Sequence, residues 1–211
     1  MPDPAQSYGH STNYLGDARL KSNRSANIAD DRNCSFWLMG LPANTSYSAL
    51  LGAIRNAGKI YATNINAPTG EIATCAAKIV FFQRTAAETL MRQIKNGKLY
   101  VVGKRITSVR WNKVKSGEHP YREQSRAIRI TGPADLMNFE YFEIFFSCRF
   151  VYVLTWKGQS YCEDPGMVSH EWHFASLRAQ AKAANAAIER EFVGRFKVHW
   201  APDPCDCYCS R

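Results

Sequence analysis

Residues Thr74–Phe82 have the sequence TCAAKIVFF, and the other expected elements of the first half of the chain are placed relative to this stretch. Its end, KIVFF, is a run of apolar and β-branched residues that favours a strand. The turn-forming sequence NAPTGE precedes it, and QRTAAETLMRQIKNGK, with apolar residues at helical spacing, follows it. The stretch is therefore expected to be a strand that leads directly into a helix.

Apolar periodicity also predicts the strands and helices before and after this stretch. Strands are expected at 34–41, at 59–65 and twice within 99–114, and helices at 45–58 and 85–94. Thr45 is the expected N-cap of the first helix, and Gly58 its end. Thr85 and Glu88 form a capping box at the second. The order β-α-β-β-α-β is a split βαβ unit, in which two helices cover one face of a four-stranded antiparallel sheet.

The second half repeats this order. Strands are expected at 126–133, 149–158, 168–176 and 194–201, and helices at 134–147 and 177–191. Trp172 and Phe174 alternate with polar residues, and with Trp156 and Trp200 they are interpreted as core or inter-domain aromatics. The predicted fold class is α+β, with two ferredoxin-like βαββαβ domains, each a four-stranded antiparallel sheet backed by two helices.

Composition divides the chain into five segments. Residues 1–32 are polar and lack periodicity, so a disordered tail is expected there. The predicted segments after it are a first domain at 33–115, a linker at 116–125, a second domain at 126–202, and a cysteine-containing tail at 203–211. No run approaches the roughly 18 apolar residues of a membrane helix, and no signal-peptide core is present. An intracellular protein, nuclear or cytoplasmic, is therefore expected.

The positive charge is concentrated in the first half. Residues 33–115 contain 12 Lys and Arg residues but only Glu71 and Glu88, a net charge of +10. Residues 126–202 carry a net charge of only +1. A polyanion is therefore the expected partner of the first domain, with a merely soluble basic surface as the alternative.

The βαββαβ repeat resembles the RNA recognition motif (RRM) family, in tandem. FWLMGLP, at Phe36–Pro42, looks like the short ribonucleoprotein motif. TCAAKIVF, at Thr74–Phe81, lies where the long motif K/R-G-F/Y-G/A-F-V-x-F/Y is expected. Residues 126–202 resemble the fold with weaker motifs. The arrangement is also similar to uncharacterised filamentous-fungal proteins with two RRM-like domains and a DPC sequence near the C-terminus, here Pro202–Cys205.

The resemblance implies single-stranded RNA on the open sheet face, with bases stacked on aromatics and phosphates guided by basic residues. Trp37 takes the stacking position of the short motif, and alternation with Phe36 and Leu38 places it on the open face. A Trp covered by another segment is the alternative. The stacking positions of the long motif fall on Ala76 and Lys78, so the expected binding is weaker and more salt-dependent than in a family RRM.

Other polar residues complete the predicted RNA-binding set. Arg110 and Asn112 alternate toward the open face of the last strand, and Lys113 follows at its exit. Each could alone be an ordinary surface residue, but their clustering on a domain of charge +10 favours a joint role. The full set is Trp37, Tyr61, Lys78, Arg110, Asn112, Lys113, Lys59 and Arg105.

The second domain departs further from the family pattern. Arg129 falls at its short-motif position, and Glu171 and His173 fall at its long-motif positions. A carboxylate there repels phosphate, so the domain is interpreted as a degenerate RRM: a structural partner, a protein-binding face or a weak RNA clamp. Arg129 and Glu171 would lie on neighbouring strands and could pair. His173 is interpreted as a surface histidine.

Catalytic and metal sites are not expected. Cys205, Cys207 and Cys209 could bind a soft metal, but they lack CxxC geometry, so a disordered tail with free thiols is preferred. No phosphate loop, GxSxG or HExxH motif occurs. We therefore expect no cofactor and no enzymatic activity. The predicted function is RNA binding, and the alternative is a protein–protein interaction module built on degenerate RRM folds.

Overall fold

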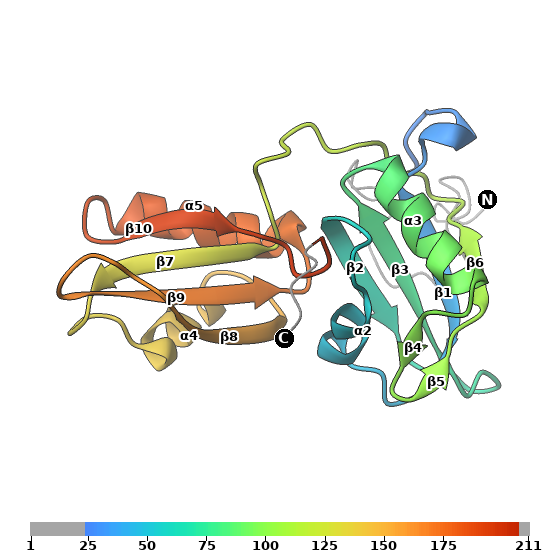
Figure 1. Ribbon diagram of the computed structural model, residues 1–211, viewed down its shortest axis with the longest axis horizontal. Coiled ribbons are helices and arrows are strands. Elements are labelled where there is room, and N and C mark those ends of the chain that lie inside the picture. Colours follow the sequence, from blue (N-terminus) through green and yellow to red (C-terminus); the bar gives the residue numbers. More distant parts are fainter. Residues whose placement is uncertain (1–23, 207–211) are drawn as a thin grey trace, which may run out of the picture.

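The computed structural model describes residues 24–206. Residues 1–23 of the tail expected at 1–32, and residues 207–211 with Cys207 and Cys209, lie outside the described residues. Two four-stranded antiparallel sheets follow one another along the chain, each with helices on one face (Figure 1). The predicted α+β class with two ferredoxin-like βαββαβ domains is confirmed. No helix among residues 24–206 is long and apolar enough to cross a membrane.

The first domain has the strand order β2-β3-β1-β6. Its elements are β1 (Ser35–Leu41), α2 (Tyr47–Ala53), β2 (Ile60–Asn66), β3 (Cys75–Phe81), α3 (Arg84–Lys95) and β6 (Ser108–Trp111). A small hairpin of β4 (Tyr100–Val101) and β5 (Lys104–Arg105) connects α3 to β6. The two strands that carry the motif sequences, β1 and β3, are therefore neighbours at the centre of the sheet.

The end signals of α2 differ from the sequence expectation. The Ser46 hydroxyl, not that of Thr45, caps the helix, because it accepts a hydrogen bond from the Ala49 N–H at 3.1 Å. Thr45 instead donates to a carbonyl of the preceding turn at 2.7 Å. The helix ends at Ala53, before Gly58. Either hydroxyl could have capped the helix by sequence, and the path of the preceding turn decides between them.

The capping box expected at the start of α3 is wrong. The helix begins at Arg84, one residue before Thr85, and its N-cap makes no side-chain hydrogen bond. Glu88 pairs with the Arg84 guanidinium at 2.7 Å, one helical turn away. That guanidinium also lies 3.5 Å from the ring centroid of Trp111 on β6. Arg84 thus links the start of α3 to the edge of the sheet.

The core of the first domain lies between its sheet and its two helices. On β1, Phe36 and Leu38 are fully buried, whereas Trp37 between them is only half-buried. On β3, Ala77 and Ile79 are fully buried and face the same core. Because side chains of a strand alternate between faces, the residues between these positions lie on the uncovered face.

The second domain has the matching strand order β10-β7-β9-β8. Its elements are β7 (Ala127–Pro133), α4 (Phe139–Ser147), β8 (Leu154–Ser160), β9 (Met167–Phe174), the π-type turn η3 (Leu177–Ala181), α5 (Lys182–Glu191) and β10 (Lys197–Ala201). Trp172 and Phe174 are fully buried among aromatic residues of α4, so their core prediction is confirmed. The single helix expected at 177–191 is broken, because Ala179 has a φ of +61°.

The described part of the expected N-terminal tail, residues 24–32, is held against the end of the first domain. The Ala26 N–H donates to the Lys115 carbonyl at 2.9 Å, and the Lys115 ammonium lies 2.6 Å from a carboxylate oxygen of Asp30. These contacts give residues 24–32 hydrogen-bond partners within the protein, whereas the polar groups of a disordered segment would hydrogen-bond to water. Residues 24–32 are therefore not a free tail.

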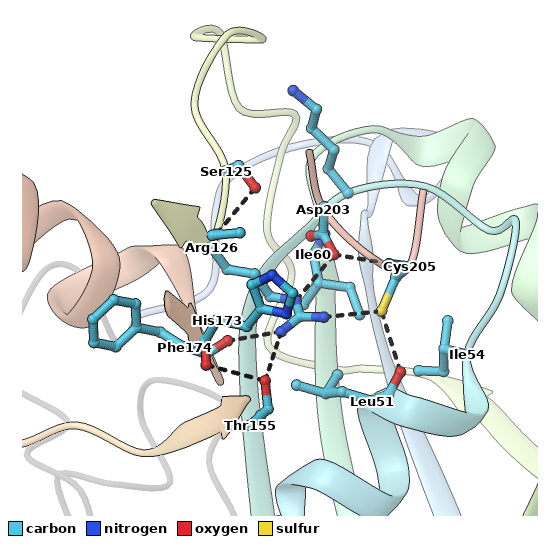
Figure 2. A network of polar contacts seen from close by, with 12 residues as sticks. Leu51, Ile54, Ile60, Ser125, Arg126, Thr155, His173, Phe174, Asp203 and Cys205 are labelled. Carbon is cyan, nitrogen blue, oxygen red and sulfur yellow. Dashed lines mark hydrogen bonds and ion pairs between the residues drawn. The ribbon is translucent and has the colours of Figure 1, made fainter. Parts of the chain in front are cut away.

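A buried ion pair lies at the joint between the two domains (Figure 2). Arg126, directly after the linker, is 2% exposed, and Asp203, after β10, is fully buried. Arg126 Nε donates to Asp203 Oδ1 at 3.0 Å, and its other nitrogens donate to Thr155 Oγ1, the Phe174 carbonyl and Cys205 Sγ. A buried charge is tolerated only with such complete pairing.

The segment after β10 also docks on the first domain. The second carboxylate oxygen of Asp203 accepts the Ile60 N–H at 2.8 Å, and the Cys205 carbonyl accepts the N–H groups of Ala57 and Gly58. Residues 203–206 are thus folded into the domain joint, which corrects the expectation of a disordered tail. Burial raises the pKa of the Cys205 thiol to about 12, so this thiol stays protonated.

Candidate nucleic-acid interface

One row of side chains crosses the open face of the first sheet. Lys78 lies directly opposite Trp37, and Arg110 lies opposite Trp37 on its other side. Asn64 lies opposite Lys78, so the row spans all four strands. Directly opposed residues of antiparallel strands share one sheet face, with Cβ atoms about 4.5–5.5 Å apart. We call Asn64, Lys78, Trp37 and Arg110 the cross-strand row.

The row has one aromatic platform. Ala76 and Asn66 form the next row on one side and offer no ring. On the other side, Ser35 lies opposite Val80, and both are buried. The half-buried indole of Trp37 is therefore the aromatic ring at the centre of the described open face. Cations lie on both sides of it.

Lys78 is half-buried in the middle of the sheet. Partial loss of water around its ammonium, together with the positive charge of Arg178, lowers the pKa of Lys78 to about 8. The side chain is therefore still mainly charged at pH 7, and it loses its proton in a mildly alkaline range where ordinary lysines keep theirs.

The end of β6 contributes exposed cations. Arg110 and Lys113 are exposed, and Lys113 follows the strand as expected. Asn112 is more constrained, because its Oδ1 accepts the Val114 N–H at 2.9 Å. Its carbonyl accepts the side-chain amide of Asn33 at 2.9 Å. Asn112 thus shapes the turn at the strand end, and the charge at this edge comes from Arg110 and Lys113.

Tyr61 and Lys59 lie against the linker rather than in the cross-strand row. β2 has an irregular register between Ile60 and Ala62, and the Tyr61 ring packs 4.7 Å from the ring of His119. The Lys59 ammonium donates to the carbonyls of Arg122 and Gln124, at 2.6 and 3.2 Å. Both predicted RNA contacts are thus engaged in holding residues 119–124 on the domain.

Arg105 also lies away from the row. It is on β5, in the hairpin between α3 and β6, and it is exposed. A Cβ atom added to Gly97 would come within 2.0 Å of Arg105 Nη2, so the guanidinium covers the turn after α3. Arg105 therefore lies beside the turn that follows α3 and not on the open face of the sheet.

The open face of the second domain is internally neutralised. Arg129 Nη2 lies 2.9 Å from Glu171 Oε2, as expected for their neighbouring strands. His173 Nε2 lies 2.6 Å from the other carboxylate oxygen, and this hydrogen bond, with that from Arg129, lowers the pKa of Glu171. The interpretation of His173 as a surface histidine is wrong, because it is 5% exposed and bonded to Glu171.

Trp156 is an exposed aromatic, whereas the sequence predicted a core or inter-domain position for it. It is 37% exposed and lies opposite His173, with the two rings 4.6 Å apart. The indole lies across Gly158, where an added Cβ would be 2.5 Å from its Cζ2 atom. A glycine two residues along the same strand face was the signal for this flat arrangement, since any side chain there would displace the ring.

The described residues contain no group of three or more His, Cys, Asp and Glu side chains that could hold a metal. Cys205, the cysteine of the CDCYC sequence that is described, donates its S–H to the Leu51 carbonyl at 3.4 Å. Cys34 and Cys75 are buried and free, whereas Cys148 is exposed.

No protein-family model matches the sequence, and no curated protein matches it. Among solved structures it is similar to RNA recognition domains 1 and 2 of Sex-lethal from Drosophila melanogaster, at 18% identity, with 80% of this chain and 100% of that chain covered and a TM-score of 0.27. It is also similar to the first two RRM domains of the yeast poly(U)-binding protein Pub1, at 15% identity, with 80% and 99% covered and a TM-score of 0.33. At these values the likeness transfers no function to this chain.

Proposed function

We propose that the chain binds single-stranded RNA on the open face of its first sheet. The observation that carries the proposal is the cross-strand row, in which one half-buried indole lies between Lys78 and Arg110. The indole offers a base a stacking surface, and the cations offer pairing to the adjacent phosphates. The net charge of +10 over residues 33–115 favours a polyanion over a neutral partner. Such a role is one of binding rather than catalysis, in the nucleus or the cytoplasm.

The proposed RNA contacts are Trp37, Lys78, Arg110 and Lys113. Tyr61, Lys59, Asn112 and Arg105 are assigned no direct contact, because each is engaged with the protein itself. With one ring in place of the usual two or three, the affinity depends mainly on phosphate pairing. Binding should therefore show little base preference and fall steeply as salt is raised.

Replacing Trp37 with alanine should weaken RNA binding by about 10- to 100-fold, since one base stack contributes about 1–3 kcal/mol. Lys78→Glu should weaken it at least as much at low salt, because it puts a carboxylate beside the phosphates. The measurement is fluorescence anisotropy of the full chain with a labelled random-sequence RNA of about 12 nucleotides, at two salt concentrations.

The matched control for these variants is Lys104→Glu, which makes the same charge change on the exposed hairpin of β4 and β5. It should have a smaller effect, because it changes only the distant field of the domain. Circular dichroism should show that all variants remain folded. Affinities for Trp37→Ala and Lys78→Glu equal to that of Lys104→Glu would exclude the open sheet as the RNA-binding surface.

RNA affinity should also fall as the pH rises from 7 to 9. Burial and Arg178 lower the pKa of Lys78 to about 8, so its charge is lost in this range. Bound phosphate favours the charged form, which places the midpoint of the decline at or above pH 8. Lys78→Arg stays charged and should flatten the curve. Parallel pH curves for the wild type and Lys78→Arg would show that Lys78 does not contact the RNA.

A protein partner for the second domain is the second candidate function. Its open face carries an ion pair between Arg129 and Glu171 beside the exposed indole of Trp156, which suits a peptide better than a phosphate chain. RNA binding that is absent at low salt from the folded full chain would favour this role over the first.

A further inference from the structure

The two open sheet faces point to opposite sides of the molecule. In Figure 1, α3 lies in front of the first sheet, whereas β7 and β9 lie in front of α5. The contacts agree, because Ser48 of α2 donates to the Thr155 carbonyl on β8 at 3.0 Å, and η3 contacts β2. An RNA that leaves the first open face toward the second domain therefore meets η3 and its helical side rather than its sheet.

A hydrogen-bonded anchor holds the start of η3 on the first sheet. The Ser176 hydroxyl accepts the Thr63 N–H at 2.9 Å and is 3.3 Å from the Thr63 carbonyl, to which it donates. Because β2 is an edge strand, this N–H and this carbonyl would otherwise hydrogen-bond to water. Thr63 is adjacent to Asn64, which lies directly opposite Lys78. Arg178, two residues after Ser176, is thus part of η3, the segment that contacts β2 at the end of the cross-strand row.

The backbone at Arg178 leaves the helical path. Arg178 has an extended ψ of 127°, and Ala179 has a φ of +61°, a conformation that costs a non-glycine residue about 1–2 kcal/mol. The turn is held on both sides, because the Ala181 N–H donates to the Ser176 carbonyl at 3.3 Å and the Gln180 side chain accepts the Val153 N–H at 3.2 Å. The fold thus maintains a strained turn whose effect is to take Arg178 out of the helix.

We propose that Lys78 and Arg178 form a composite phosphate-binding site at the domain joint, through which RNA continues from the first sheet onto the helical side of the second domain. The inference rests on the proposed function and adds the second domain to it. These are cations from different domains at one joint, and each can pair with a phosphate oxygen of an RNA strand that crosses it. The lowered pKa of Lys78, to which the charge of Arg178 contributes, is consistent with this proximity.

The test is the salt dependence of RNA binding by full-length Arg178→Gln. For single strands, each lost phosphate contact lowers the slope of log affinity against log salt by about 0.7. We expect this change together with about 3- to 10-fold weaker binding at low salt. Arg178→Lys keeps the charge and should restore most of the slope. Arg195→Gln, an exposed position in the turn between α5 and β10, is the matched control.

A double-variant comparison tests whether the two cations act on one phosphate. If they do, Lys78→Gln and Arg178→Gln together should weaken binding by less than the product of their separate effects. Independent, multiplicative effects would contradict a shared phosphate and overturn the composite site.

Failure of this inference is distinguishable from failure of the proposed function. If Trp37→Ala weakens binding while Arg178→Gln and Arg195→Gln share the wild-type slope, the first sheet binds RNA and the composite site is wrong. If the folded wild-type chain binds no RNA at low salt, both the proposed function and the composite site are wrong. A thermal unfolding midpoint of Arg178→Gln close to that of the wild type would confirm that the strained turn is intact in the variant.

Discussion

Replacing Asp203 with alanine is expected to lower the free energy of unfolding by about 3–5 kcal/mol, because the substitution leaves the Arg126 charge buried without its partner. Arg126 is 2% exposed and cannot recover the lost interaction from water without opening the joint. The substitution also removes the acceptor of the Ile60 N–H, a second buried group. Urea denaturation of the full chain, followed by far-ultraviolet circular dichroism, measures the loss.

Asp206→Ala provides the matched control, since Asp206 is an exposed aspartate three residues further along the same segment. Its effect should stay within about 0.5 kcal/mol. The Asp203→Ala transition should also broaden or divide into two, because the domains lose their shared buried group and can unfold separately. A single sharp transition with less than about 1 kcal/mol of destabilisation would show that the ion pair does not secure the joint.

The expected instability bears directly on RNA binding. The Arg126–Asp203 pair and the Ser176–Thr63 anchor lie on the same joint, and they set the position of η3 against β2. A site assembled before its ligand arrives avoids the ordering entropy that flexibly linked domains lose on binding. If the composite site binds RNA, Asp203→Ala should therefore bind RNA more weakly than Asp206→Ala under conditions where both variants are folded.

The sheets could be predicted from the sequence because the alternation of apolar and polar residues within each strand shows which side chains face the core. Alternation in CSFWLMGL separates Phe36 and Leu38 from Trp37, and the structure keeps that separation. The same alternation in TCAAKIVFF places Lys78 on the face opposite Ala77 and Ile79. Strand order then makes Lys78 and Trp37 direct neighbours. Part of the candidate site thus follows from strand periodicity and topology alone.

The domain joint could not be predicted in this way, because its partners are distant in sequence. Asp203 accepts from Ile60, 143 residues earlier, and its segment PDPC has neither apolar periodicity nor a helix or strand pattern. The contact of Tyr61 with the linker could not be predicted for a related reason, since only the folded path of the linker brings His119 onto its ring. Arg178 was hidden within a segment whose Ala-rich composition favours an unbroken helix.

Two tryptophans on opposite faces of the second sheet differ in burial, and this difference predicts unequal effects of their substitution. Trp172→Ala should lower the free energy of unfolding by about 3–5 kcal/mol, because it opens a large cavity in the aromatic core. Trp172 is fully buried, with its ring 5.5 Å from that of Phe146 and 6.2 Å from that of Phe142. Trp156→Ala, on the open face and 37% exposed, should cost about 1 kcal/mol or less.

A second substitution separates volume from hydrogen bonding at Trp172. Its indole N–H has no partner among the described residues, so Trp172→Phe removes an unsatisfied buried donor together with part of the ring. Its cost should therefore be only about 1–2 kcal/mol, well below that of alanine. Urea denaturation of the three variants tests this order. Equal losses for Trp156→Ala and Trp172→Ala would mean that the two faces of the second sheet are buried alike, which would contradict an open face there.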